Sequence, residues 1–271
     1  MKRILCLVLS LCLCSFVACK KETVTLGVMA DVDSLPVAYA YLMGYLPENI
    51  KLEVFTSAPL RDSALISHNL IGCISDLLSA VQSADAGAEI RTPITTGGSY
   101  ALVENDSACQ TVAISSGTVI EYMCDTMQVA YDKTIIASMA ERCTMLKQQK
   151  VKAAVLPEPF AAYAVEKGCR YVKRNADSRV GVMVFYTAYT TTPSFAAFCT
   201  AYSRAIAEIA KGADLTASMR FLGFPPVDIS QLQLRYTSIA PPDINTFDSV
   251  VAYLRSHLQY KGKVAYENLC Y

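Results

Sequence analysis

A short apolar run, a turn and an apolar-periodic helix, in that order, constrain the fold more than any other stretch of the sequence. The run covers residues 153–156, and a Pro-Glu-Pro turn centred on Glu158 follows it. Residues 160–167 have helical apolar spacing and end at Gly168. This order predicts a buried strand, a loop and a capped helix, the unit from which parallel sheets are built. Glu158 stands where open α/β sheets bind ligands, or it only favours the positive end of the helix dipole.

The N-terminus has the pattern of a secretory signal. Two basic residues precede an apolar run of about 15 residues, which is shorter than the about 20 residues of an ordinary membrane span. Phe16-Val17-Ala18-Cys19 resembles a bacterial lipobox, which implies that residues 1–18 are removed and that Cys19 carries lipid. The alternatives are cleavage after Ala18 by an ordinary signal peptidase and an uncleaved anchor. All three predict a domain outside the cytoplasm.

Charge and length exclude several classes of protein. Lys plus Arg and Asp plus Glu are both 24 in 271 residues, with no basic stripe, which argues against a nucleic-acid partner. A chain of this size is long enough for a good core. Seven of the 11 cysteines follow Cys19, and none forms a Cys-x-x-Cys pair. We interpret them as buried small apolar residues rather than as a disulfide framework. With only His68 and His257 available, no metal site and no cofactor site is predicted.

Strands and helices alternate along the rest of the chain, with short connections that favour crossover helices on a parallel sheet. The strands are predicted at 23–29, 52–57, 71–74, 90–96, 99–104, 111–114, 153–156, 170–173 and 181–186. The helices are predicted at 35–46, 58–67, from 75 onward, 119–130, 138–149, 160–167, 194–211, 215–222, 229–236 and 247–259.

Polar residues gather where several predicted strands end and helices begin. Asp31, Asp33 and Ser34 follow the first strand, Ser57 and Thr96 end others, and Asp76 opens a helix. Ser115, Ser116 and Thr118 lie at another helix start, where free backbone N–H groups and hydroxyls accept a carboxylate, sulfonate or phosphate. For Asp76, helix capping is an equal alternative to ligand binding. Any helix N-cap also uses Ser and Thr.

The segment Ala154-Val155-Leu156-Pro157-Glu158-Pro159-Phe160-Ala161 resembles the Glu-Pro segment of type 2 periplasmic solute-binding proteins, in the nitrate, sulfonate, taurine and thiamine-pyrimidine group. Tyr266-Glu267-Asn268-Leu269 resembles the C-terminal tail of that family. The resemblance implies an α/β fold of two lobes, each a mainly parallel sheet flanked by helices, joined by two hinge crossings. It implies lobe I at 19–103 and 187–271, lobe II at 104–186, and crossings within 99–104 and 182–186.

The resemblance also implies the site and the partners. Asp31, Asp33, Ser34 and Tyr39 would line the cleft from lobe I, and Ser115, Ser116 and Thr118 from lobe II. The expected protein is a monomeric, non-enzymatic subunit of an ABC importer, anchored through lipid on Cys19, which delivers a small solute to permease and ATPase subunits.

Charge decides the expected ligand. Asp31, Asp33, Asp76 and Glu158, with few Arg or Lys in the same loops, favour an N–H donor or cation such as an aminopyrimidine thiamine precursor, stacked on Tyr39 or Tyr186. A sulfonate, nitrate or taurine-type anion at the Ser115 turn is the alternative. An enzyme of the menaquinone-pathway type and a partner-binding surface lipoprotein are two further alternatives.

Overall fold

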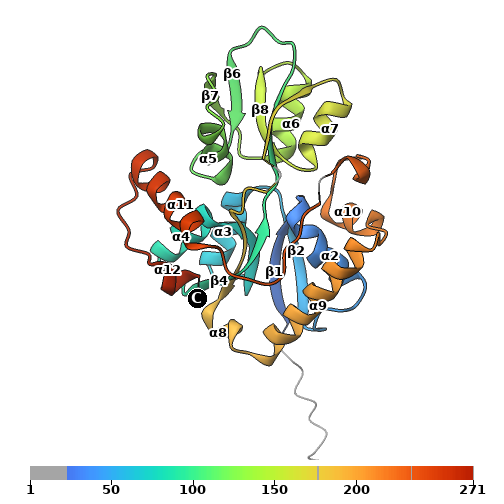
Figure 1. Ribbon diagram of the computed structural model, residues 1–271, viewed down its shortest axis with the longest axis vertical. Helices are drawn as coiled ribbons and strands as arrows, with labels where there is room; N and C mark the ends of the chain where they lie inside the picture. The colour runs from blue at the N-terminus through green and yellow to red at the C-terminus, as the bar shows by residue number, and fades with distance from the viewer. Residues whose placement is uncertain (1–22, 176, 233, 271) are drawn as a thin grey trace, which may run out of the picture.

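Figure 1 shows a computed structural model of the protein, in which two lobes are joined by two crossing segments. The structure describes residues 23–175, 177–232 and 234–270. The predicted signal, residues 1–18, and the predicted lipid site, Cys19, lie outside the described residues. Within the described ranges, no helix combines the length and the apolar character needed to cross a bilayer.

Lobe I is built on a five-stranded sheet in the order β2-β1-β3-β10-β4. The strands are β1 (Val24–Met29), β2 (Ile50–Phe55), β3 (Gly72–Asp76), β4 (Ile90–Gly97) and β10 (Gly181–Tyr186). β1 is parallel to β2 and β3, whereas β10 is antiparallel to both β3 and β4. The return strand therefore lies near the middle of the sheet, where all six of its residues except Tyr186 are buried.

Lobe II repeats this arrangement in the order β7-β6-β8-β5-β9. Its strands are β5 (Tyr100–Glu104), β6 (Thr111–Ile114), β7 (Asp132–Ile135), β8 (Ala153–Pro157) and β9 (Arg170–Asn175). β5 is antiparallel to β8 and β9, and β6 is parallel to β7 and β8. In both lobes the antiparallel strand is the one that has just crossed from the other lobe. The prediction of mainly parallel sheets is confirmed, with one reversed strand in each.

The crossings lie a few residues earlier than the sequence analysis expected. β5 pairs only within the lobe II sheet, and β10 pairs only within the lobe I sheet. The chain therefore changes lobe at 98–99 and before Gly181, not after residues 103 and 186. The reason is that 100–104 and 181–186 are apolar strands whose two faces are buried in the lobe that they enter, which sequence hydrophobicity cannot assign to either lobe.

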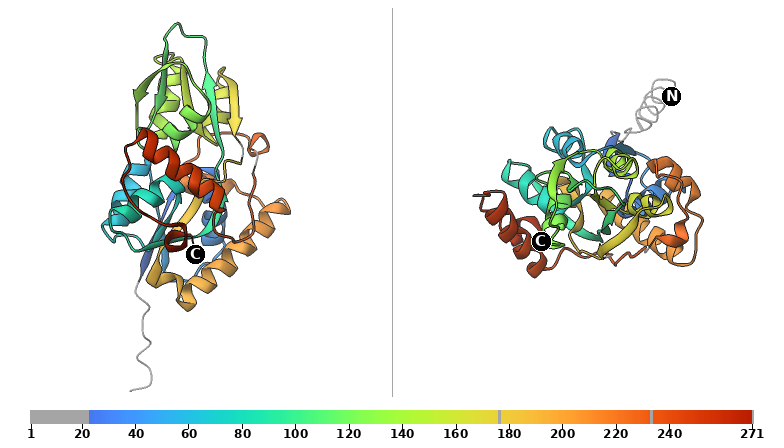
Figure 2. Two further views of the ribbon diagram at one scale, coloured as in Figure 1. Left: turned by 60° about the vertical axis from the view of Figure 1, so that its left-hand side comes forward. Right: turned by 90° about the horizontal axis from the view of Figure 1, so that it is seen from above.

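Helices cover both faces of each sheet (Figures 1 and 2). In lobe I they are α2 (Leu35–Leu42), α3 (Ala58–Ile66), α4 (Leu77–Asp85), α8 (Thr187–Thr190), α9 (Pro193–Ala210), α10 (Thr216–Leu222), α11 (Ile244–His257) and α12 (Tyr266–Leu269), with 3-10 turns η2 (Val32–Ser34) and η3 (Ile229–Gln231). In lobe II they are α5 (Val119–Thr126), α6 (Met139–Lys147) and α7 (Phe160–Glu166). α2, α9 and α10 pack together on one side of lobe I, and α4 packs against α11 and α12 on the other.

The alternation of side chains along each strand divides the core into layers. In β5, Leu102 packs with α4 and α5 residues, whereas Ala101 and Val103 face the α6 and α7 side. The first of these layers is continuous between the lobes, because α5 of lobe II and α4 and α11 of lobe I share one apolar cluster. Apolar side chains of the two lobes are therefore in contact next to the cleft.

Some elements differ from the prediction. The helix expected at 229–236 is only the 3-10 turn Ile229–Gln231, because Leu232, Leu234 and Tyr236 pack on one apolar cluster with a spacing of two residues rather than that of a helix. β7 had no prediction, since its side chains are partly or fully exposed and carry little apolar signal. The helix expected at 35–46 ends at Leu42, and Gly44 follows with a positive φ of 69°.

Candidate functional site

A cavity of about 50 Å³ lies between the lobes, at the carboxyl ends of the parallel strands. By the same kind of measure one water needs about 10–15 Å³, so the closed lobes leave room for a small solute. Lobe I lines it with Met29, Asp31, Val32, Asp33, Ala58, Arg61, Ser75 and Asp76, and lobe II with Tyr100, Ser115, Thr118, Val119, Ile120, Ala137, Met139, Arg142 and Pro157, with Ser99 between them. Each wall sets a few polar groups among apolar ones, and each holds one buried arginine.

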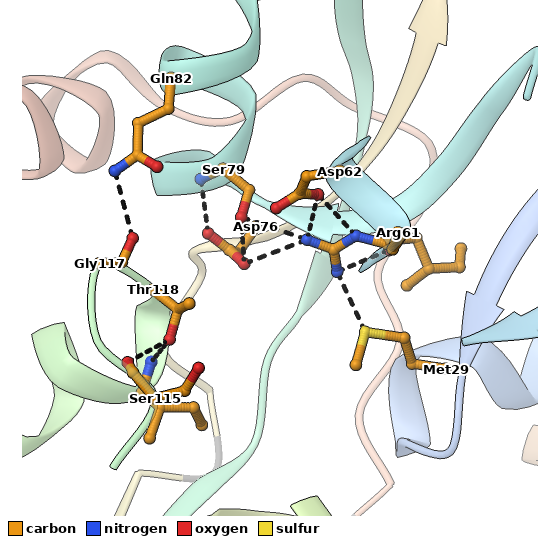
Figure 3. A network of polar contacts seen from close by, with 11 residues as sticks. Met29, Arg61, Asp62, Asp76, Ser79, Gln82, Ser115, Gly117 and Thr118 are labelled. Atoms are coloured by element: carbon orange, nitrogen blue, oxygen red, sulfur yellow. Dashed lines mark hydrogen bonds and ion pairs between the residues drawn. The ribbon is translucent and has the colours of Figure 1, made fainter. Parts of the chain in front are cut away.

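The arginine of lobe I is fully partnered (Figure 3). Arg61 Nε donates to Asp62 Oδ1 at 2.9 Å, and its other nitrogens donate to the Ile74 carbonyl and to Ser79 Oγ. Arg61 Nη2 lies 2.7 Å from Asp62 Oδ1 and 3.8 Å from Asp76 Oδ2. Burial alone would lower the pKa of Arg61, but the charges of these carboxylates raise it above its usual value.

Asp76 has the structural role that the sequence left open, and it also lines the cavity. Its Oδ1 accepts the Ser79 N–H at 2.9 Å, which caps α4. Burial raises the pKa of Asp76 in spite of the nearby Arg61 charge. Helix capping and Arg61 therefore occupy much of this carboxylate.

Two further carboxylates of lobe I line the cavity without a basic partner among the described residues. Asp31 Oδ1 accepts both the N–H and the hydroxyl of Ser34, at 3.0 and 2.9 Å. Asp33 Oδ1 accepts the Gly98 N–H at 3.3 Å. Burial, and then the charge of Asp31, raises the pKa of Asp33 to about 7, and burial also raises the pKa of Asp31. This end of the cavity is therefore able to hold a proton or a cation near neutral pH.

The arginine of lobe II has no carboxylate partner among the described residues. Arg142 lies on α6 with only 1% of its surface exposed, and its Nη1 donates to the carbonyls of Ile136 and Ala137 at 2.8 and 2.9 Å. Its buried Nε makes no hydrogen bond in the described structure. Burial lowers the pKa of Arg142 to about 10, so the group stays charged at neutral pH. A buried, unpaired guanidinium at a cavity wall is a site for an anionic group.

The lobe II wall continues at the start of α5. Thr118 caps this helix, since its Oγ accepts the Ile120 N–H at 3.2 Å and donates to the Ser115 carbonyl at 2.7 Å. Gln82 of α4 reaches across the cleft and donates to the Gly117 carbonyl at 3.2 Å (Figure 3). The start of α5 thus lines the cavity and is held by lobe I.

Five of the residues predicted from the sequence line this cavity: Asp31, Asp33, Asp76, Ser115 and Thr118. Two others support it, since Ser34 holds Asp31 and Thr96 is buried beside Asp33. Ser116 does not line the cavity: it is exposed, and its hydroxyl donates to Glu121.

Tyr39, Ser57, Glu158 and Tyr186 do not line the cavity. Tyr39 donates to Glu208 on the α2–α9 face, and Ser57 is buried before α3. Tyr186 donates to the Leu65 carbonyl and stacks on His68 at 4.7 Å. Neither tyrosine is therefore placed to stack on a solute in the cavity.

Glu158 is buried inside lobe II, where its carboxylate is fully used. It accepts the Ala162 N–H at 2.9 Å, the Tyr171 hydroxyl at 3.0 Å and Arg174 Nη2 at 3.1 Å. Its carbonyl oxygen accepts the Val32 N–H of lobe I at 3.2 Å. The structure thus gives Glu158 the helix-start role that the sequence left open, together with a backbone contact between the lobes.

Sequence reasoning missed both arginines because they lie within helices, not in the loops where ligand residues were sought. In α3 and α6 each stands among polar neighbours, a pattern typical of an exposed helix face. Among the described residues, no histidine, cysteine or lysine lines the cavity. The described residues contain no group of three or more His, Cys, Asp or Glu side chains that could hold a metal ion.

Comparison with known proteins supports the fold and leaves the sequence family open. No family model and no curated protein sequence matches the chain. Solved structures do match. The ligand-binding component of an ABC-type import system from Staphylococcus aureus, with zinc bound, has a TM-score of 0.68 at 13% identity, covering 93% of this chain and 97% of that one.

Two sulfonate-binding proteins match similarly. The periplasmic aliphatic sulphonate binding protein SsuA from Escherichia coli has a TM-score of 0.67 at 17% identity and covers 90% of this chain and 96% of its own. The alkanesulfonate-binding protein SsuA from Xanthomonas axonopodis pv. citri, bound to MOPS, has a TM-score of 0.69 at 14% identity, with coverages of 92% and 96%. With its two five-stranded sheets and two crossings, the chain has the two-lobed fold of type 2 periplasmic binding proteins.

Proposed function

We propose that the protein is the solute-binding subunit of an ABC importer and that it captures a small solute with an acidic group between its lobes. The observation that carries the ligand class is Arg142, a buried guanidinium on the cavity wall that donates to two carbonyls and has no carboxylate partner among the described residues. An acidic group of the solute would supply the missing charge and accept from the free guanidinium nitrogens.

This proposal changes the ligand that the sequence favoured. An aminopyrimidine was expected because few basic residues occur in the predicted binding loops. Arg61 and Arg142 reach the same cavity from helices, which removes that charge argument, and neither Tyr39 nor Tyr186 lines the cavity to stack on a ring. Sulfonate, carboxylate and nitrate are therefore placed ahead of aminopyrimidines in our proposal, and the names of two matching structures, both sulfonate binders, agree with this order.

Binding without catalysis suits the groups that line the cavity. Serine hydroxyls are present, but a nucleophilic serine needs an adjacent base, and the part of the lining that the structure describes holds no histidine or lysine. We further propose that Cys19 carries a lipid that keeps the protein at the outer face of a bacterial membrane. There it would act as a monomer and meet its permease.

Thermal unfolding of the purified protein with single solutes tests the proposal. A solute at one hundred times its dissociation constant stabilises the folded state by about 2.7 kcal/mol, which a melting curve resolves. We expect stabilisation by short sulfonates, carboxylates or nitrate, and its loss in Arg142→Met. Arg220→Met, an exposed arginine on α10, is the matched control and keeps the response.

Three results contradict the proposal. Stabilisation by an aminopyrimidine alone would restore the ligand that the sequence favoured. No response to any solute, in a protein with a sharp unfolding transition, would favour the partner-binding surface lipoprotein. An acid that binds Arg142→Met as tightly as the wild type would show that Arg142 is not the anion site.

A further inference from the structure

The cavity has a second charged end, opposite in sign to Arg142. Asp31 and Asp33 follow β1 in lobe I, and one oxygen of each carboxylate is held by local N–H or hydroxyl groups. No described Lys, Arg or His forms an ion pair with either one, although both line the cavity. Together with Arg142, the cavity presents an unpaired cation on one lobe and two unpaired carboxylates on the other.

Asp33 lies at the point where the two hinge crossings meet. The Gly98 N–H that it accepts belongs to the first crossing. Gly181 opens the strand after the second crossing, and a Cβ built there would lie 2.6 Å from Asp33 Oδ2 and 2.9 Å from the Gly98 nitrogen. Only glycine allows this approach. The crossings are also tied to each other, since the Ser178 N–H donates to the Gly98 carbonyl at 3.0 Å.

Among the described residues, none of the main electrostatic influences on Asp33 is a basic group. The charges of Asp31 and Asp177 both raise the pKa of Asp33. The charge of Asp33 contributes in turn to the raised pKa values of Tyr100, Tyr202 and Tyr236. Arg61 acts on Asp31 and is already paired with Asp62. A cationic group of the solute is the partner that these carboxylates lack.

We propose that the solute is a short zwitterion whose amino group binds the Asp31–Asp33 pair while its acidic group binds Arg142. This inference rests on the proposed function and adds a second recognised group. Because Asp33 also accepts the hinge Gly98 N–H, the amino group is the part of the solute that reaches the hinge. A bound zwitterion then makes contacts to both lobes that only the closed arrangement provides, which is the condition for stabilising that state.

Matched pairs of ligands test the inference by calorimetry on the full protein. The pairs are ethanesulfonate with 2-aminoethanesulfonate and propionate with 3-aminopropionate, which differ only in the amino group. The wild type is expected to bind the amino member of at least one pair about tenfold or more tightly, the range of a charge-assisted hydrogen bond. Asp33→Asn and Asp31→Asn are each expected to reduce that preference, whereas Asp248→Asn, on the exposed face of α11, keeps it.

Proton exchange gives an independent readout that does not need a variant. An amino group requires Asp33 in its ionised form, so its binding below pH 7 releases protons, whereas an acid without an amino group releases none at this carboxyl. Calorimetry in two buffers with different ionisation enthalpies measures this difference.

The outcomes separate this inference from the proposed function. Acids that bind through Arg142 with no gain from the amino group, and with no proton release, overturn the zwitterion and leave the acid binder. Failure of every acid, with or without an amino group, overturns both. An amino preference that both Asp31→Asn and Asp33→Asn retain assigns the amine to another residue and also overturns the inference.

Discussion

The two walls of the cavity hold the same residue type in opposite electrostatic situations. Arg61 of lobe I has Asp62, Asp76 and a carbonyl as partners, whereas Arg142 of lobe II has only two carbonyls. A buried charge without a partner costs folding free energy, and so does removing one member of a buried pair. In lobe I the arginine of the cavity wall therefore has its charge partner without solute, which we call a complete wall. In lobe II we propose that the solute supplies the partner, so this wall is incomplete without it.

The largest expected effect comes from removing each arginine in turn. Arg61→Met leaves the buried Asp76 and the nearby Asp62 without their cation, and we expect it to lower the free energy of unfolding by about 3–5 kcal/mol. Arg142→Met removes an uncompensated charge and two hydrogen bonds, which largely offset each other, so we expect a change within about 1 kcal/mol.

Urea unfolding of the two variants without solute measures this difference. If Arg142→Met loses as much stability as Arg61→Met, the proposed difference between the two arginines is wrong. That result would mean that the two carbonyl bonds of Arg142 hold α6 in place, and it would return Arg142 to a purely structural role.

The second effect concerns the carboxylate end of lobe I and depends on pH. The pKa of Asp33 is raised to about 7 in the folded protein, against about 3.9 in an unfolded chain. A raised pKa means that the folded state binds the extra proton between these values. The stability of the solute-free protein is therefore expected to fall as pH rises from 4 to 7 and to level off above that, by on the order of 2–4 kcal/mol.

Asp33→Asn sharpens this prediction because it removes the charge and keeps an oxygen for the Gly98 N–H. In urea unfolding at several pH values, the variant is expected to lose most of the slope between pH 4 and 7 and to exceed the wild type in stability at pH 8. If Asp33→Asn leaves the slope of the unfolding free energy against pH unchanged, other groups cause that slope. Asp31 and Asp76 would be the next candidates, since burial also raises their pKa values.

The fold could be predicted from the sequence because its evidence is local. The Glu158 segment, the alternation of strands with helices and the Gly breaks each depend on neighbours in the chain, and β8 and α7 lie where the pattern put them. The crossings were misplaced by a few residues. An apolar strand such as Gly181–Tyr186 is equally compatible with either sheet until its partners are known.

The site could be predicted only where its residues follow strands. Asp31, Asp33, Ser115 and Thr118 were found by their position in loops. Arg142 was missed, since its function comes from burial by elements far apart in the sequence. Tyr39 was placed in the site by resemblance and Glu158 by its position after a strand, and here their polar atoms are bonded elsewhere. The expected ligand changed because its charge argument counted loop residues alone.

The smallest expected effect concerns a direct contact between α11 of lobe I and α5 of lobe II, which does not involve the solute. Tyr253 of α11 donates to Asp125 Oδ2 of α5 at 2.7 Å, and its ring meets Tyr122 edge-on at 4.9 Å. Tyr253→Phe removes one hydrogen bond between the lobes, and Asp125 keeps Lys133 at 2.7 Å. We expect this change to destabilise the closed state relative to the open state by about 0.5–1.5 kcal/mol. Solute binding measured by calorimetry should then weaken about two- to tenfold.

Tyr39→Phe is the matched control for this contact, since it removes a hydroxyl bonded to a carboxylate at 2.8 Å within lobe I only. It is expected to leave the dissociation constant unchanged, and an effect as large as that of Tyr253→Phe would return Tyr39 to the binding site. If neither variant changes binding, closure depends on the shared apolar layer and on the solute. Arg142 and the Asp31–Asp33 pair would then be the polar groups that couple solute binding to closure. The contrast between the complete wall of lobe I and the incomplete wall of lobe II would account for binding without a contribution from the Tyr253 contact of α11.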